Sequence, residues 1–140
     1  MNLSTVDREH QIFDAIPTSA RAARKFVGEI LRQRSAPNSV VVDFRLVASE
    51  LVSNVIEHGD GMGLTVFGDF SDQNWWEVGV VAGSTLSSSK MKHPNEWTVA
   101  GSEDRTGRGL GIVRKLMDDV IIDISEGLVS VRCRLRRTGN

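Results

Sequence analysis

Glu50, Asn54 and His58 follow one another at four-residue intervals and are the residues of this chain best suited to chemistry. In a helix, positions four apart differ by only about 40° around the axis, so the three side chains would form one polar stripe. A carboxylate one turn before a carboxamide suits a general base placed beside a metal-ion ligand. The alternative is a solvated helix edge, and for an isolated Glu-x-x-x-Asn pattern this plainer interpretation is the stronger one.

The helix that would carry this stripe is predicted over about residues 40–58. Its apolar positions recur at helical spacing, as expected of a buried face: Phe44, Val47, Leu51 and Val55. Gly59 then occupies a position at which glycine commonly ends a helix. The polar stripe borders the apolar face, so its side chains should lie at the edge of the core.

A glycine-rich segment at residues 107–111, Gly-Arg-Gly-Leu-Gly, precedes a second helical pattern that begins at Ile112. Glycines before a helix let backbone N–H groups approach phosphate oxygens at the positive end of the helix dipole. Arg105 and Arg108 could add charge-assisted hydrogen bonds to the same anion. A glycine-rich entry into a buried helix explains the segment equally well. It is neither a P-loop nor a dinucleotide-binding fingerprint, because the required spacing and preceding strand are absent.

Length and composition limit the class of protein. With 140 residues, the chain is predicted to form a single domain over residues 1–140. A net charge of −1 gives no general attraction to nucleic acid or to anionic membranes, and no apolar run is long enough to span a bilayer. The single cysteine and the polar residues 1–11 are typical of a protein without disulfides or a signal peptide. We therefore expect a cytoplasmic protein with no direct nucleic-acid or membrane partner.

The other segments are predicted to form one more helix, over residues 20–34, and five strands, over about residues 10–16, 64–70, 75–81, 120–124 and 128–135. Thr18 or Ser19 could cap that helix. Trp75 and Trp76 should point to opposite faces of their strand. In the last strand Cys133 alternates with arginines, which predicts a small buried thiol beside a solvated basic face.

The order of these elements resembles the GHKL (Bergerat-fold) ATPases. Within them, the sequence is most similar to the small anti-sigma-factor serine kinases of the RsbW type. Two motifs carry the resemblance. Residues 49–59, Ser-Glu-Leu-Val-Ser-Asn-Val-Ile-Glu-His-Gly, match the N box, and residues 106–113, Thr-Gly-Arg-Gly-Leu-Gly-Ile-Val, match the glycine-rich G2 box.

The resemblance implies an α/β two-layer sandwich with the Bergerat fold, in which helices pack on one face of a mixed, mostly antiparallel sheet. It implies ATP and Mg²⁺ as cofactors, with Asn54 on the metal and Glu50 activating the attacking hydroxyl. Arg105 takes the position of a catalytic lid arginine, and the ATP lid itself would cover about residues 83–107. The further nucleotide-binding residues that it implies are His58, Gly83, Gly107, Arg108, Gly109, Leu110 and Gly111.

Members of this family dimerise, hold a sigma factor inactive and phosphorylate a serine on a small STAS-domain antagonist. The resemblance therefore implies an ATP-dependent protein serine kinase that forms a homodimer and has these two partners.

One departure from the family pattern affects this expectation. The family carries an adenine-binding aspartate in a D-x-G-x-G box after the second hairpin strand, where this chain reads Val-Val-Ala-Gly-Ser-Thr at residues 80–85. If Gly83 is the first glycine of the box, Val81 takes the place of the acid. Three interpretations remain open: a working kinase with altered adenine recognition, an anti-sigma or STAS-binding module that no longer uses ATP, and a GHKL-fold domain with an unrelated partner.

Overall fold

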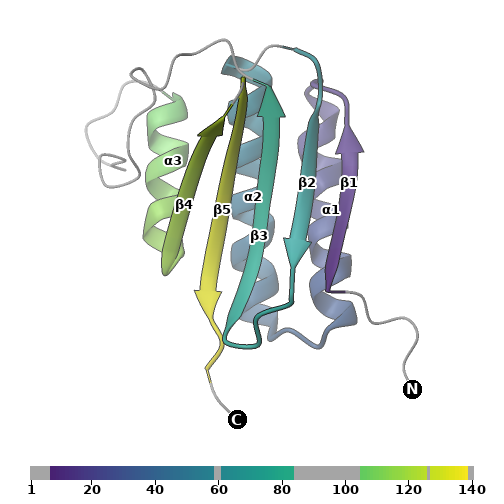
Figure 1. The fold of residues 1–140 in the computed structure, drawn as a ribbon, viewed down its shortest axis with the longest axis vertical. Helices are drawn as coiled ribbons and strands as arrows, with labels where there is room; N and C mark the ends of the chain where they lie inside the picture. The colour runs from purple at the N-terminus through teal and green to yellow at the C-terminus, as the bar shows by residue number, and fades with distance from the viewer. Residues whose placement is uncertain (1–6, 59–60, 84–104, 126, 139–140) are drawn as a thin grey trace.

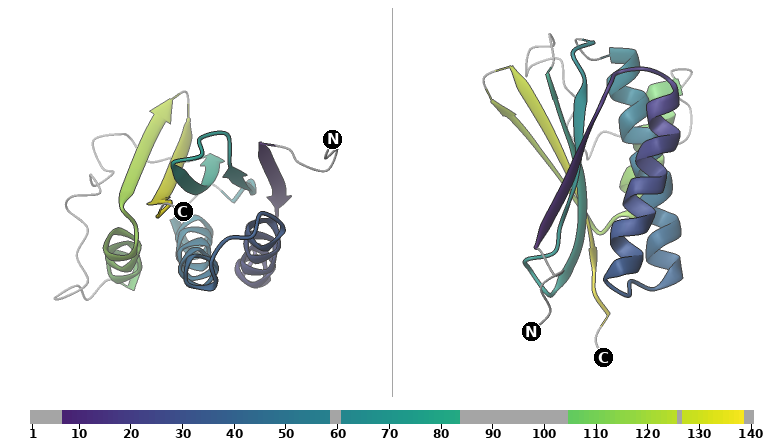
Figure 2. Two further views of the ribbon diagram at one scale, coloured as in Figure 1. Left: turned by 90° about the horizontal axis from the view of Figure 1, so that it is seen from below. Right: turned by 90° about the vertical axis from the view of Figure 1, so that its right-hand side faces the viewer.

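The computed structural model describes residues 7–58, 61–83, 105–125 and 127–138. Within these residues the chain forms three helices and five strands: β1 (Arg8–Phe13), α1 (Thr18–Gln33), α2 (Asn38–His58), β2 (Leu64–Asp69), β3 (Trp75–Gly83), α3 (Arg105–Leu116), β4 (Asp119–Ser125) and β5 (Leu128–Arg136). The strands form one sheet in the order β1-β2-β3-β5-β4, and each neighbouring pair is antiparallel (Figure 1). All three helices cover the same face of this sheet (Figure 2). The predicted α/β two-layer sandwich is confirmed, with a sheet that is antiparallel throughout and not mixed.

The core lies between the sheet and the helices. The central helix α2 buries the predicted apolar residues Phe44, Val47 and Leu51, while Val55 is half-buried against the core. Gly68 of β2 lets α1 approach the sheet closely, because an added Cβ would lie 2.7 Å from the Ile30 side chain. The predicted cap of α1 by Thr18 or Ser19 is wrong: the helix begins at Thr18 itself, and its N-cap, Pro17, makes no side-chain cap hydrogen bond.

Strand alternation assigns each residue of β3 to one of the two sheet faces. Val78, Val80 and Ala82 are buried toward the helices together with Trp76. Trp75 lies on the other face, where the Arg136 guanidinium is 4.5 Å from its ring centroid. The two tryptophans therefore point to opposite faces, as predicted.

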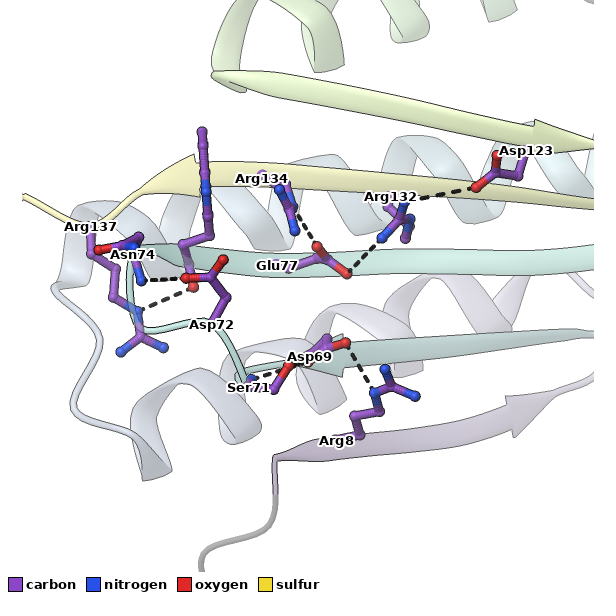
Figure 3. A network of polar contacts seen from close by, with 11 residues as sticks. Arg8, Asp69, Ser71, Asp72, Asn74, Glu77, Asp123, Arg132, Arg134 and Arg137 are labelled. Atoms are coloured by element: carbon purple, nitrogen blue, oxygen red, sulfur yellow. Dashed lines mark hydrogen bonds and ion pairs between the residues drawn. The ribbon is translucent and has the colours of Figure 1, made fainter.

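The face without helices, called the open face below, is built of paired charges as well as apolar residues. Representative residues of the open face are Arg8, Phe67, Glu77, Val81, Asp119 and Arg134. Glu77 is only 4% exposed there, because Arg134 donates a hydrogen bond of 2.6 Å to its Oε1 and Arg132 lies 3.8 Å from its Oε2 (Figure 3). Two of the arginines predicted to be simply solvated thus neutralise a buried carboxylate.

The prediction for Cys133 is confirmed. Cys133 is fully buried, and burial raises the pKa of its thiol to about 12, so it is an inert core residue. Among the described helices, none has both the length and the apolar character needed to cross a lipid bilayer.

Candidate functional site

Glu50 and Asn54, the predicted general base and metal ligand, lie on one side of α2. Glu50 and Asn54 are both half-buried, and His58 is exposed in the last turn, 3.7 Å from the Glu57 carboxylate. Arg45 identifies the opposite side of this helix, because its side chain packs against Gly28 of α1. Asn54 is about 180° and Glu50 about 140° around the helix from Arg45. Both residues therefore face away from α1.

The helix on that side of α2 is α3. It packs against α2 and begins at the end of the molecule where α2 finishes, so the N-terminus of α3 lies beside the C-terminal half of α2 (Figure 1). The first turn of a helix has N–H groups without intrahelical partners and carries the positive end of the dipole. The structure thus brings Glu50 and Asn54 to the side of α2 that faces an anion-attracting helix end.

The glycine-rich segment differs from its prediction. Glycines were expected before a helix, but α3 already begins at Arg105, so the glycine-rich segment lies inside its first turns. The free N–H groups are consequently those of about residues 105–108. Glycine costs helix stability, and tertiary packing of Val113 and Met117, which are 0% and 7% exposed, offsets that cost.

The residues predicted to bind nucleotide lie in different elements of the structure. Gly107, Arg108 and Gly109 belong to α3, Leu110 is half-buried and Gly111 is buried. Gly83 ends β3 at the same end of the molecule (Figure 1). Residues 84–104 make up most of the predicted lid and lie outside the described residues. Gly59, which was predicted to end the helix, lies outside them as well.

The position assigned to the missing aspartate is corrected by strand geometry. Val81 pairs with Thr65 and Ser130 and belongs to the open face, so its side chain points away from α2 and α3. Ala82, 7% exposed, shares the helix-facing side with Val78 and Val80. An acid at the end of β3 could reach a ligand on the helix side only from position 82. The alternation of Val78, Val80 and Ala82 was the sequence signal that could have identified this position.

Comparison with known proteins identifies the family. A family model described as the histidine kinase-like ATPase domain matches residues 13–135. The chain belongs to this family. A solved structure of the RsbU and RsbW domains of Rv1364c from Mycobacterium tuberculosis is similar in fold, with a TM-score of 0.66 and 18% sequence identity. The match covers 94% of this chain and 32% of that one, and no match was found among curated proteins.

A histidine kinase-like ATPase domain implies bound ATP, and the residues present fit that cofactor. The free N–H groups at the start of α3 suit phosphate oxygens, and Arg105 and Arg108 lie in its first turn. Mg²⁺ is usually held by one or two carboxylates together with substrate phosphates and water, and the carboxamide oxygen of Asn54 is a ligand of the same hard, neutral-to-anionic oxygen class. Within the described residues no group of three or more His, Cys, Asp or Glu could form an all-protein metal site.

Proposed function

We propose that this histidine kinase-like ATPase domain binds Mg·ATP between α2 and α3 and phosphorylates a serine on a STAS-domain protein. The observation that carries the proposal is the placement of Glu50 and Asn54, one turn apart, on the side of α2 that faces the start of α3. The family match and the fold shared with a structure containing an RsbW domain support it.

Each residue has a defined part in this proposal. Asn54 presents a carboxamide oxygen to Mg²⁺, which supplies charge neutralisation at the phosphates when bound. Glu50 lies one turn earlier, about 6 Å along the helix axis, and accepts the proton of the attacking serine hydroxyl. Arg105, placed as the lid arginine, is the second catalytic residue and stabilises the charge that develops on the transferred phosphoryl group.

The remaining nucleotide contacts come from the start of α3 and the end of β3, which lie at the same end of the molecule as the C-terminus of α2. The N–H groups of the first turn of α3 and the Arg108 guanidinium bind the phosphates. The glycines of α3 leave room for close approach of the phosphates, since they carry no side chain. These contacts also include His58, Gly83, Leu110 and Gly111.

The biological role that we propose is partner switching in the control of transcription. The domain holds a sigma factor inactive, releases it when a STAS-domain antagonist binds, and ends that release by phosphorylating the antagonist. We further propose that it works as a cytoplasmic homodimer. It touches neither DNA nor a membrane directly, in agreement with the net charge of −1.

A second function is favoured by one specific observation, the apolar Ala82 at the helix-facing end of β3. Without an acid there, the adenine amino group lacks a charged acceptor, and nucleotide binding weakens. The alternative is an anti-sigma or STAS-binding module that has lost ATP-dependent chemistry but keeps the fold.

Phosphotransfer with a matched pair of variants tests the proposal. The protein is incubated with Mg²⁺ and γ-labelled ATP together with the STAS-domain proteins of the same genome, and label on serine is measured. Glu50→Gln should keep its ATP affinity but lose transfer by roughly 10²–10⁴-fold, because only the proton acceptor is removed. Glu57→Gln, a change at an exposed carboxylate on the same helix, should retain transfer.

Unchanged transfer in Glu50→Gln would remove that residue from the mechanism. A wild-type protein that binds STAS-domain proteins but transfers no label to any of them would support the non-enzymatic alternative.

A further inference from the structure

The helix pair of α1 and α2 carries positive charge that is not matched by nearby acids. The two helices lie side by side on the sheet (Figure 2). α1 contains four basic residues but a single acid, Glu29. Within the described residues Arg24 and Arg32 of α1 and Arg45 of α2 make no ion pair, whereas an arginine of the sheet such as Arg134 is paired with a carboxylate. The three helix arginines are called the arginine cluster below.

Gly28 brings two members of the arginine cluster together where the helices meet. A Cβ at this position would lie 3.3 Å from Nη1 of Arg32 and 3.3 Å from Cδ of Arg45. Since both atoms lie at that distance from one point, they are no more than twice that distance apart. The two side chains, one from each helix, therefore lie together over the glycine although both are positively charged.

Arg24 adds a buried donor one turn before Gly28. Residues four apart differ by only about 40° around a helix, so the two residues lie on the same side of α1. The Nε atom of Arg24 is buried and has no hydrogen-bond partner among the described residues. Buried polar groups are nearly always hydrogen-bonded, so this atom calls for a partner. A guanidinium group only donates hydrogen bonds, and a partner must therefore present an acceptor oxygen.

A phosphate group has the chemistry that the arginine cluster would recognise. Guanidinium groups donate N–H bonds in a planar fork that fits phosphate oxygens, and they keep their positive charge at neutral pH. A phosphate ester carries about two negative charges and three strong acceptor oxygens. It can accept bonds from donors on both helices, whereas one carboxylate would balance only one of the three positive charges.

We infer that the contact between α1 and α2 around Gly28 binds a phosphate group of a small molecule through Arg24, Arg32 and Arg45. The site is separate from the proposed nucleotide site, because Arg45 lies about 180° around α2 from Asn54. Glycine lowers the stability of a helix, and at position 28 it leaves room for two arginine side chains. A bound phosphate would join the two helices and stabilise the folded state.

NMR titration of the wild-type protein with inorganic pyrophosphate, in the absence of Mg²⁺, tests this site. The Nε–H signals of Arg24, Arg32 and Arg45 should shift together and saturate at one common midpoint. The Nε–H signal of Arg8, whose Nε is already 3.0 Å from Asp69, should shift little. Shifts confined to the start of α3, or unsaturated shifts of all exposed arginines, would overturn the inference.

Three variants separate a specific site from general attraction to positive charge. Arg45→Gln should weaken pyrophosphate binding about tenfold or more, because a charge-assisted hydrogen bond is lost, and should keep the wild-type affinity for Mg·ATP. Gly28→Ala should also weaken pyrophosphate binding, since the new methyl group meets both arginine side chains, while the higher helix propensity of alanine keeps α1 folded. Arg8→Gln removes the same charge from the sheet and should bind pyrophosphate like the wild-type protein. Wild-type binding by Arg45→Gln, or an equal loss in all three variants, would contradict the site.

A vesicle assay distinguishes a small molecule from a lipid headgroup as the source of the phosphate. The wild-type protein should not sediment with phosphatidylcholine vesicles that contain phosphatidic acid, in agreement with its net charge of −1. Sedimentation that Arg45→Gln abolishes, combined with no effect of pyrophosphate on the NMR spectrum, would overturn a small-molecule ligand.

Discussion

Replacement of Ala82 by aspartate should restore an adenine acceptor that this chain lacks. Ala82 is the helix-facing residue nearest the end of β3, on the side of the sheet where α2 and α3 lie. A carboxylate there can accept a hydrogen bond from the adenine amino group. Ala82→Asp should therefore tighten ATP binding and improve discrimination against GTP, because selectivity for a base depends on pairing its polar groups.

The size of the gain follows from the burial of the site. A hydrogen bond to a charged acceptor contributes about 1.5–3 kcal/mol, which corresponds to roughly a 10- to 150-fold lower Kd for ATP. Ala82 is only 7% exposed, so without nucleotide the new carboxylate is left poorly solvated. We expect the free variant to lose about 1–3 kcal/mol in its free energy of unfolding. Calorimetric titration and urea denaturation measure the two effects.

The neighbouring position provides the matched control. Val81→Asp introduces the same carboxylate one residue earlier, on the open face, and should leave ATP affinity unchanged whatever it does to association. If Val81→Asp tightens ATP binding and Ala82→Asp does not, the assignment of residues to faces near the end of β3 does not describe the nucleotide site. If the wild-type protein already binds ATP tightly and prefers it to GTP, another group of the protein recognises the adenine.

Three further predictions concern residues outside the nucleotide site. Glu77→Gln should lower the free energy of unfolding by about 1–3 kcal/mol in urea denaturation, because two arginines lose their buried partner, whereas Asp123→Asn at a 67% exposed carboxylate should change it little. Cys133 should resist iodoacetamide in the native protein at pH 8. Because its pKa is raised from 9.0 to about 12, stability should fall as the pH rises above 9, and labelling before unfolding would contradict this. Asp69 has a lowered pKa, so its stabilising contribution is present above pH 3.8 and is lost as the pH falls through the lowered value. Asp69→Asn should therefore reduce the difference between the free energies of unfolding at pH 7 and pH 3.

The order and type of the elements could be predicted from the sequence because each has a clear period. The apolar spacing of residues 44–55 predicted α2, and the alternation around Cys133 predicted β5. The resemblance carried by the two motifs implied a site for ATP and Mg²⁺ at Glu50 and Asn54. The placement of these residues on the side of α2 that faces the start of α3 was not predicted, because it depends on the antiparallel arrangement of the two helices.

Other features could not be read from local patterns. The start of α3 was misplaced because three glycines lower helix propensity, whereas packing against α2 decides the outcome. Val81 was preferred to Ala82 because spacing to Gly83 does not say which way a side chain points. Glu77 looked like one more charged strand residue, and only the pairing of β3 with β5 places two arginines over it.

Magnesium-dependent ATP binding by wild type and Asn54→Ala tests the central proposal most directly. Calorimetry with Mg²⁺ should show weak ATP binding to wild type, and Asn54→Ala should lose the part of the affinity that depends on the metal. With EDTA in place of Mg²⁺, the two proteins should bind ATP equally weakly, because the carboxamide then has no ion to hold. No ATP binding by either protein, or an equal loss in Asn54→Ala with and without Mg²⁺, would contradict a nucleotide site between α2 and α3.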